Sequence, residues 1–295
     1  MDISALPILS LIIFSPILGI ALAAMFREEG NGTPAKVAAL VSSVITFFLS
    51  LHLWFNFDSG TADLQMVERS PWISQFNIEY FLGLDGLNFF FFLLITFITP
   101  LTLLGSWNVA KRNWQFQIQM LLLQIGMLGC FAAMDVVLFY VFFEVMLVPM
   151  YLLIGIWGGT NRLYATIKFF IYTMFGSLMM LVSLLYTANI YRDLQGAWSF
   201  NVLDWYGMEI AVETQFWLFI GFAAPTAINA IAIGQFGSTL ELGINPQILS
   251  VSAVLALVTM HSIKMRTSRD GQNLLVGLKI VLVVGLVLIA LGKGS

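Results

Sequence analysis

Charged side chains are scarce in this sequence. Only 10% of the 295 residues are Asp, Glu, Lys or Arg, whereas soluble globular domains carry about 25%. Hydrophobic residues make up 59% of the chain, and the mean hydropathy is +0.91. A chain with so few charges cannot cover a water-facing surface, so the composition excludes an ordinary soluble domain and indicates an integral membrane protein.

Cysteine, histidine and clustered basic residues are also nearly absent. Cys130 is the single cysteine and there are two histidines, which excludes an intramolecular disulfide and leaves too few soft ligands for a metal site. The net charge is −3 without any basic run, so the electrostatic pattern of nucleic-acid binding is missing. The sequence also holds no Gly-rich phosphate-binding motif and no haem motif. We therefore expect no cofactor, no metal and no nucleic-acid partner for this chain.

Long apolar runs are what the sequence has instead. A helix that spans a bilayer needs about 20 mainly apolar residues. Runs of that kind lie at residues 6–26, 36–56, 85–107, 115–134, 136–157, 165–190, 215–236, 247–263 and 273–292. The pattern predicts an all-α fold, a polytopic bundle of about 8–9 transmembrane helices.

The connections between these runs differ in length and charge. Cations such as Arg27, Lys111 and Arg162 lie in the short connections and predict that these face the cytoplasm. The long connections, residues 57–84 and 191–214, are then predicted on the opposite side.

Three local features predict how the spans are arranged. Asp85 and Asp135 stand at the starts of two spans, where a carboxylate complements the helix dipole, so we interpret both as capping residues. The run Phe89–Phe92 lies within a span and is predicted to face lipid or a neighbouring subunit.

Two ionisable residues lie inside apolar runs and are the candidates for chemistry. Glu144 stands in the middle of the fifth run, where burying a carboxylate costs roughly 2.5–3.5 kcal/mol on insertion scales. This position favours a proton carrier or an ion ligand, and the alternative is a protonated Glu that hydrogen-bonds a neighbouring helix. Lys168 lies about one turn inside the next run, near enough to its end to extend its amine to the interface. It can pair with Glu144 only if the two helices face each other at matching depth.

The residues around Glu144 carry a resemblance to a known family. The stretch Phe142–Gly158 reads FFEVMLVPMYLLIGIWG, and Lys168–Thr173 reads KFFIYT. Over about residues 1–222, the chain resembles the subunit M family of bacterial NADH–quinone oxidoreductase (respiratory complex I). The resemblance implies an antiporter-like, proton-translocating membrane subunit without a redox cofactor, in which the residue matching Glu144 is central to proton transfer.

The C-terminal part of the chain has a different character. Of the 26 Phe, 8 Trp and 8 Tyr, only Phe236 lies after residue 222. The lysine-bearing helix and the second channel half expected of the subunit M family do not follow that point. Residues from about 226 to 295, with Lys264–Leu282 reading KMRTSRDGQNLLVGLKIVL, are instead similar to amino-acid permeases of the amino acid–polyamine–organocation superfamily. We therefore predict two regions, 1–222 and 223–295.

Three functions follow as hypotheses. The first is a proton-translocating subunit that couples quinone reduction to proton transport, with Glu144 and Lys168 as proton-transfer residues and no redox chemistry in the chain itself. Its expected partners are the other complex I membrane subunits, the lipid bilayer and protons, with quinone involved only indirectly, in the bacterial inner membrane. The alternatives are a fragment of a secondary amino-acid transporter and a structural membrane subunit with a broken proton relay.

Overall fold

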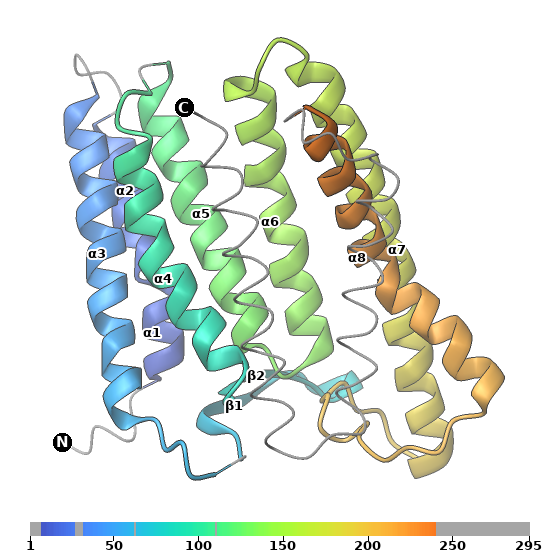
Figure 1. The fold of residues 1–295 in the computed structure, drawn as a ribbon. Coiled ribbons are helices and arrows are strands. Elements are labelled where there is room, and N and C mark those ends of the chain that lie inside the picture. Colours follow the sequence, from blue (N-terminus) through green and yellow to red (C-terminus); the bar gives the residue numbers. More distant parts are fainter. Residues whose placement is uncertain (1–6, 27–31, 62, 110, 240–295) are drawn as a thin grey trace. The chain divides into compact units, whose positions relative to one another are not determined.

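The computed structural model describes residues 7–26, 32–61, 63–109 and 111–239 (Figure 1), with side chains up to residue 225. The chain divides into two compact units, and each is described by itself. The first comprises residues Met1–Met174 and Leu181–Gln215, and the second comprises Phe175–Met180 and Phe216–Ser295. The candidate site lies in the first unit.

Six helices or helix pairs of the described residues are long and apolar enough to cross a membrane, which confirms the first six predicted spans and the polytopic helical fold. They are α1 with α2 (Ile8–Phe14 and Pro16–Met25), α3 (Thr33–Asn56), α4 (Asn88–Gly105), α5 (Asn113–Ala132), α6 (Val136–Trp157) and α7 (Arg162–Gln195). A further helix, α8 (Val212–Thr239), continues through the region boundary predicted at residue 222. The predicted spans 247–263 and 273–292 lie outside the described residues.

The first span is interrupted between α1 and α2. Pro16 occupies the first turn of α2, where its missing N–H costs no helical hydrogen bond and its fixed φ suits a helix start. The adjacent Ser15 hydroxyl lies 2.7 Å from the Thr46 hydroxyl on α3. The break is thus joined to a neighbouring helix by a polar contact inside the bundle.

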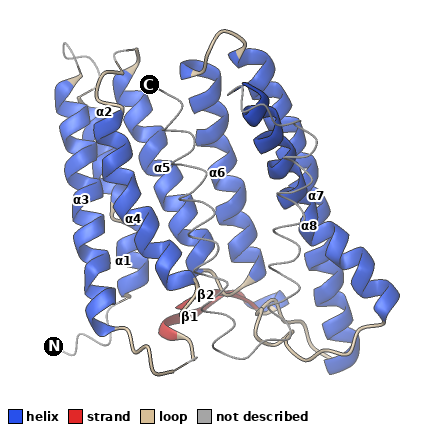
Figure 2. Cartoon of the chain, in the orientation of Figure 1, coloured by secondary structure: helices blue, strands red, loops and turns tan. Residues whose placement is uncertain are grey.

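A β-hairpin occupies the first long connection, which the sequence predicted only as a polar loop (Figure 2). Strands β1 (Gln65–Ile73) and β2 (Ile78–Leu84) pair antiparallel, with Arg69 opposite Phe81. Backbone bonds tie β2 to the α5–α6 connection, since the Met134 N–H donates to the Phe81 carbonyl at 2.9 Å. The second long loop also contacts the start of α6, because the Val136 N–H donates to the Phe200 carbonyl at 2.9 Å. Both long connections therefore meet at the start of α6, at one end of the bundle.

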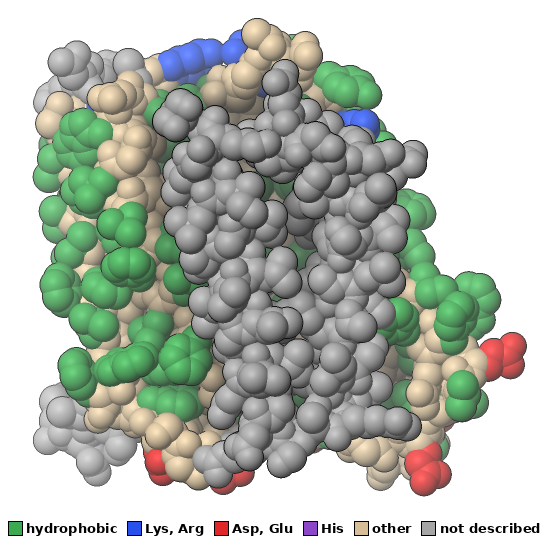
Figure 3. Space-filling model, viewed as in Figure 1, with side chains coloured by type: hydrophobic (Ala, Val, Ile, Leu, Met, Phe, Trp, Pro, Cys, Tyr) green, Lys and Arg blue, Asp and Glu red, His purple; other side chains and the backbone are tan. Residues whose placement is uncertain are grey.

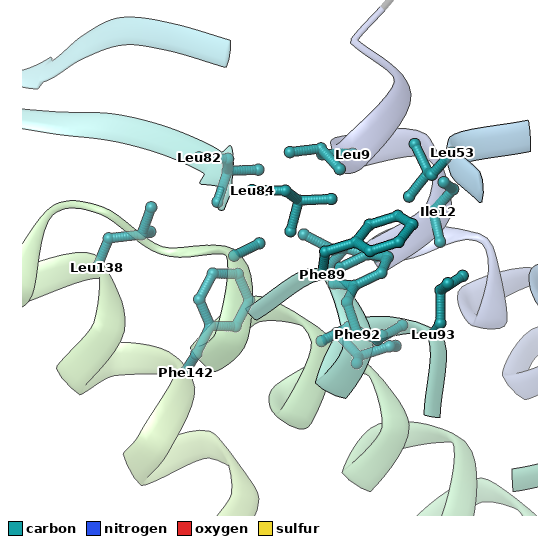
Figure 4. Close-up of a cluster of buried hydrophobic side chains, with 14 residues drawn as sticks. Leu9, Ile12, Leu53, Leu82, Leu84, Phe89, Phe92, Leu93, Leu138 and Phe142 are labelled. Carbon is teal, nitrogen blue, oxygen red and sulfur yellow. The ribbon is translucent and has the colours of Figure 1, made fainter. Parts of the chain in front are cut away.

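The apolar core joins α1, α3, α4, α5 and α6 beneath the hairpin (Figure 4). Phe89 and Phe92 lie inside it with exposures of 3% and 0%, whereas Phe90 is 51% exposed. The prediction that the whole run Phe89–Phe92 faces lipid or a neighbour was therefore wrong for these two residues. Consecutive helical residues are turned by about 100° from each other, so four in a row cannot share one face.

Polar and apolar side chains separate along the helices of the first unit. Hydrophobic side chains cover the visible outer faces of α3 and α4 (Figure 3). Cations lie at the end where α5 begins: the Lys36 amine lies 5.8 Å from the Trp107 ring, and Trp157 donates to the Lys111 carbonyl at 2.6 Å. A charge-poor middle with charged and aromatic ends is what a bilayer requires.

Candidate functional site

Helix α6 carries Glu144, and its start is fixed by a buried cap. The Asp135 carboxylate accepts hydrogen bonds from the Val137 and Leu138 N–H groups at 2.8 and 3.2 Å. Each bond satisfies a donor that the first turn of a helix leaves open. The Asp85 carboxylate does the same before α4, accepting from Leu87 and Asn88 at 2.8 and 2.7 Å. The predicted capping roles of both aspartates are confirmed.

Asp135 also holds the hairpin against α6. Its second carboxylate oxygen accepts from the Glu79 N–H of β2 at 3.0 Å, and the residue is only 1% exposed. Burial raises the pKa of the Asp135 carboxyl above its ordinary value, while the three backbone N–H donors oppose that rise. The Asp135 side chain therefore caps the first turn of α6 and joins it to β2. This carboxyl lies outside the membrane span.

Glu144 lies on the side of α6 that faces away from α5. Met146 and Phe142 touch α5 where Gly126 and Gly129 leave room for them. Glu144 is two residues from each, about 200° around the helix, and so points to the other side. The Glu144 side chain is half-buried. Its Oε1 atom is buried and has no hydrogen-bond partner among the described residues. An unpaired carboxyl oxygen in the middle of an apolar span is a site that can take up a proton or bind another donor.

The face of α6 that bears Glu144 meets α7 nearer the other end of the helix. Tyr151 and Gly155 follow Glu144 at seven and eleven residues, which keeps them on the same stripe. The Tyr151 ring lies 5.5 Å from the Phe170 ring, and a Cβ at Gly155 would lie 3.4 Å from the Thr166 hydroxyl. These two contacts place α6 and α7 antiparallel near the connection that joins them.

Lys168 is not level with Glu144 in this packing. Because Gly155 meets Thr166 and Tyr151 meets Phe170, Lys168 is level with position 153. That position is nine residues from Glu144, or about 14 Å along a helix axis. The Lys168 amine instead lies 5.5 and 5.7 Å from the rings of Tyr164 and Tyr172. In the part of the chain that the structure describes, the ion pairs are Arg69–Glu79 and Arg192–Asp193. The structure thus does not pair the two predicted site residues, and their proton-transfer roles stay predictions.

A second set of polar groups, which was not predicted from the sequence, lies on α5. Gln117 and Gln124 of α5 are buried to 1% and 0% exposure. Their spacing of seven residues within an apolar run was the available signal, since it places both on one helix face. Within the described residues, no group of three or more His, Cys, Asp or Glu side chains is arranged to hold a metal.

Comparison with known proteins identifies relatives for most of the chain. Residues 133–236, which include Glu144 and Lys168, match the family model described as NADH:quinone oxidoreductase/Mrp antiporter, TM. The chain is 40% identical over 234 residues to NADH-quinone oxidoreductase subunit M of Rhodobacter capsulatus, covering 75% of this chain and 45% of that protein. It is 34% identical over 230 residues to subunit M of Rickettsia conorii, with 76% and 46% covered. The chain thus spans less than half the length of these curated relatives.

A solved structure supports the same relationship. A chain of respiratory complex I from Thermus thermophilus with bound NADH superposes with a TM-score of 0.63 at 26% identity, covering 84% of this chain and 52% of that chain. The sequence relatives and this fold match agree with each other. The predicted resemblance to subunit M of NADH–quinone oxidoreductase is confirmed, and the chain is a multi-pass membrane protein related to the NADH:quinone oxidoreductase/Mrp antiporter transmembrane family.

Proposed function

We propose that this chain is a proton-translocating membrane subunit of an NADH–quinone oxidoreductase in a bacterial inner membrane. The observation that carries the proposal is Glu144, a half-buried carboxyl in the middle of α6 with one oxygen unpaired among the described residues. The matched family and the subunit M relatives support the same reading. The other membrane subunits of such a complex are the expected partners, and quinone is reduced elsewhere in the assembly.

The chemistry that Glu144 contributes is proton uptake and release. In its neutral form the carboxyl carries one O–H donor, and in its ionised form both oxygens accept. A carboxyl can therefore receive a proton from one neighbouring group and donate it to another.

The contacts of α6 support this role because they fix the start of the helix that carries Glu144. Asp135 anchors the start of α6 to β2 and to the helix's own first turn. Gly126 and Gly129 let α6 lie close against α5. These contacts leave Glu144 on the opposite side of α6, away from α5.

The test places this chain in a bacterium that lacks its own subunit M and measures NADH oxidation and proton uptake in membrane vesicles. Glu144→Gln keeps the side-chain shape and removes the ionisable group, and we expect it to assemble but lose most proton uptake. Glu144→Asp keeps the group on a shorter side chain and should be intermediate. The matched control is Glu209→Gln, which makes the same chemical change at an exposed position.

A second candidate function, a structural subunit with a broken relay, is favoured by one observation. Among the described residues Glu144 forms no ion pair, and Lys168 is not at its level. If Glu144→Gln and Glu209→Gln both translocate protons like the parent, the structural reading replaces the proposal. Failure of the chain to co-purify with other complex I subunits would reject both functions.

A further inference from the structure

Two buried glutamine side chains of α5 have no hydrogen-bond partner among the described residues. Gln117 and Gln124 of α5 are 1% and 0% exposed. The amide nitrogen and oxygen of each have no hydrogen-bond partner within the described part of the chain. Buried polar atoms in native proteins are nearly always hydrogen-bonded to protein or to ordered water. A span offers no bulk water to satisfy them, so these four atoms need another occupant.

Both amides belong to the face of α5 that meets α2 and α3. Leu121 lies one turn from each glutamine, on the same face, and is fully buried. It reaches the place where Gly19 of α2 lies against Ser42 of α3. The Ser42 hydroxyl there is also buried without a partner among the described residues. The three unsatisfied side chains therefore lie along one inter-helix seam, with Ser42 at the level between the two glutamines.

Neighbouring hydroxyl groups on the same seam are satisfied by the protein. The Ser43 hydroxyl donates to the Leu40 carbonyl at 2.8 Å, and that of Thr46 donates to the Ser42 carbonyl at 3.0 Å. Further along α3, the Ser50 hydroxyl lies 2.7 Å from the Thr96 hydroxyl of α4. Among the described residues, the side-chain oxygens of Asn113, Gln115 and Gln119 on α5 are also buried without a partner. Gln117 and Gln124 differ from these because both the nitrogen and the oxygen of each amide lack a partner there.

The chemistry of the three groups selects a neutral occupant. Each amide presents one donor group and one acceptor, and a hydroxyl can act as either. A cation would leave the amide N–H groups unmatched, and an anion would leave the carbonyl oxygens unmatched. Water donates and accepts equally, and one buried water makes about three hydrogen bonds to groups of this kind. We propose that Gln117, Ser42 and Gln124 bind a short line of internal water molecules between α5 and the α2–α3 pair.

This water site is separate from the candidate proton-transfer site. The opposite side of α5 meets α6 at Gly126 and Gly129, and Glu144 points away from that contact on the far side of α6. The bodies of two helices lie between the sites. The inference stands whether or not Glu144 carries protons.

Radiolytic hydroxyl-radical footprinting of the full chain in lipid nanodiscs tests the proposal, because internal water generates radicals beside the side chains that it touches. Leu121 should be oxidised faster than Leu53, which is equally buried but lies in the apolar core. Replacing both Gln117→Leu and Gln124→Leu should lower the Leu121 rate to that of Leu53. Gln195→Leu, the same change at an exposed position, should leave it unchanged.

Two results would overturn the proposal. One is equal oxidation of Leu121 and Leu53 in the parent chain, which needs no variant to fold. The other is a Leu121 rate that the double glutamine variant does not change. Ser42→Ala, which removes only a hydroxyl, provides a milder variant, and it should lower the Leu121 rate part of the way.

Discussion

Helices α5 and α6 are neighbours of similar length, yet they differ in how deeply they are buried and in where their polar side chains lie. Half of the most apolar stretch of α5 is buried, against 22% for α6. The more polar helix, α5, lies inside the bundle and encloses its glutamines. The more apolar helix, α6, leaves most of its surface to other contacts and carries a single carboxyl on its far side. Polar side chains that are buried inside a membrane bundle, as on α5, commonly have a structural role. A single carboxyl on a helix that is otherwise apolar, as on α6, is instead a candidate for function.

The largest effect on stability is expected in the apolar core, at Phe92 of α4. Phe92 is fully buried in the apolar core, whereas its neighbour Phe90 is 51% exposed. Phe92→Ala leaves a cavity and should lower the free energy of unfolding by about 3 kcal/mol or more. Phe90→Ala should cost well under about 1 kcal/mol, because exposed substitutions usually change little. Thermal unfolding of both variants in one lipid composition measures the difference, and equal losses would mean that the packing around α4 is not as described.

The joint between α5 and α6 should be the next most sensitive place. A Cβ at Gly129 would overlap the Phe142 ring of α6, and one at Gly105 would meet nothing within 4 Å. Gly129→Ala should therefore push the two helices apart and cost about 1–3 kcal/mol. Gly105→Ala, at the end of α4, should be neutral or slightly stabilising because alanine loses less backbone entropy on folding. Protease resistance during a temperature ramp compares them, and a Gly129→Ala chain as resistant as Gly105→Ala would contradict the close α5–α6 contact.

A smaller, pH-dependent effect is expected at Asp135, where α5 passes into α6. Burial raises the pKa of this carboxyl in the folded chain. Its contribution to stability is therefore fully present below the ordinary pKa, about 3.9, and is lost as pH rises through the raised value. Lowering the pH from neutral should stabilise the parent relative to Asp135→Asn, which does not titrate. The single amide oxygen of Asn can accept from the first turn of α6 or from the Glu79 N–H, but not from both.

Unfolding midpoints of the parent and Asp135→Asn across this pH range measure the effect. Asp193→Asn, an exposed change on α7, serves as the control and should follow the parent. A parent that loses stability relative to Asp135→Asn as the pH falls would show that hydrogen bonding outweighs burial at this carboxyl.

Much of this fold follows from the sequence, because a bilayer demands long apolar helices. The first six spans and the two aspartate caps could be predicted, since each depends on local composition alone. The β-hairpin was not predicted, and the Met134–Phe81 bond that joins β2 to the α5–α6 connection links segments that are distant in sequence. The Phe89–Phe92 run was misassigned because apolar side chains suit lipid and core equally.

The candidate site was predictable only in part. Glu144 was identifiable because a carboxyl in an apolar run is rare whatever the surrounding fold. Its separation from Lys168 depends on how α6 and α7 are aligned, which the Tyr151–Phe170 and Gly155–Thr166 contacts define. The division into regions 1–222 and 223–295 stays a prediction.

Proton exchange by Glu144 is the central claim, and infrared difference spectroscopy tests it most directly. The assembled complex is isotope-labelled at its glutamate carboxyls and examined during NADH-driven turnover. The account predicts a carboxylic-acid signal that changes with turnover, disappears in Glu144→Gln, and persists in Glu209→Gln. It also predicts that Glu144→Gln unfolds at the temperature of the parent, because Glu144 forms no hydrogen bond or ion pair through its buried oxygen within the described residues. A turnover signal that is unchanged in Glu144→Gln would contradict the account.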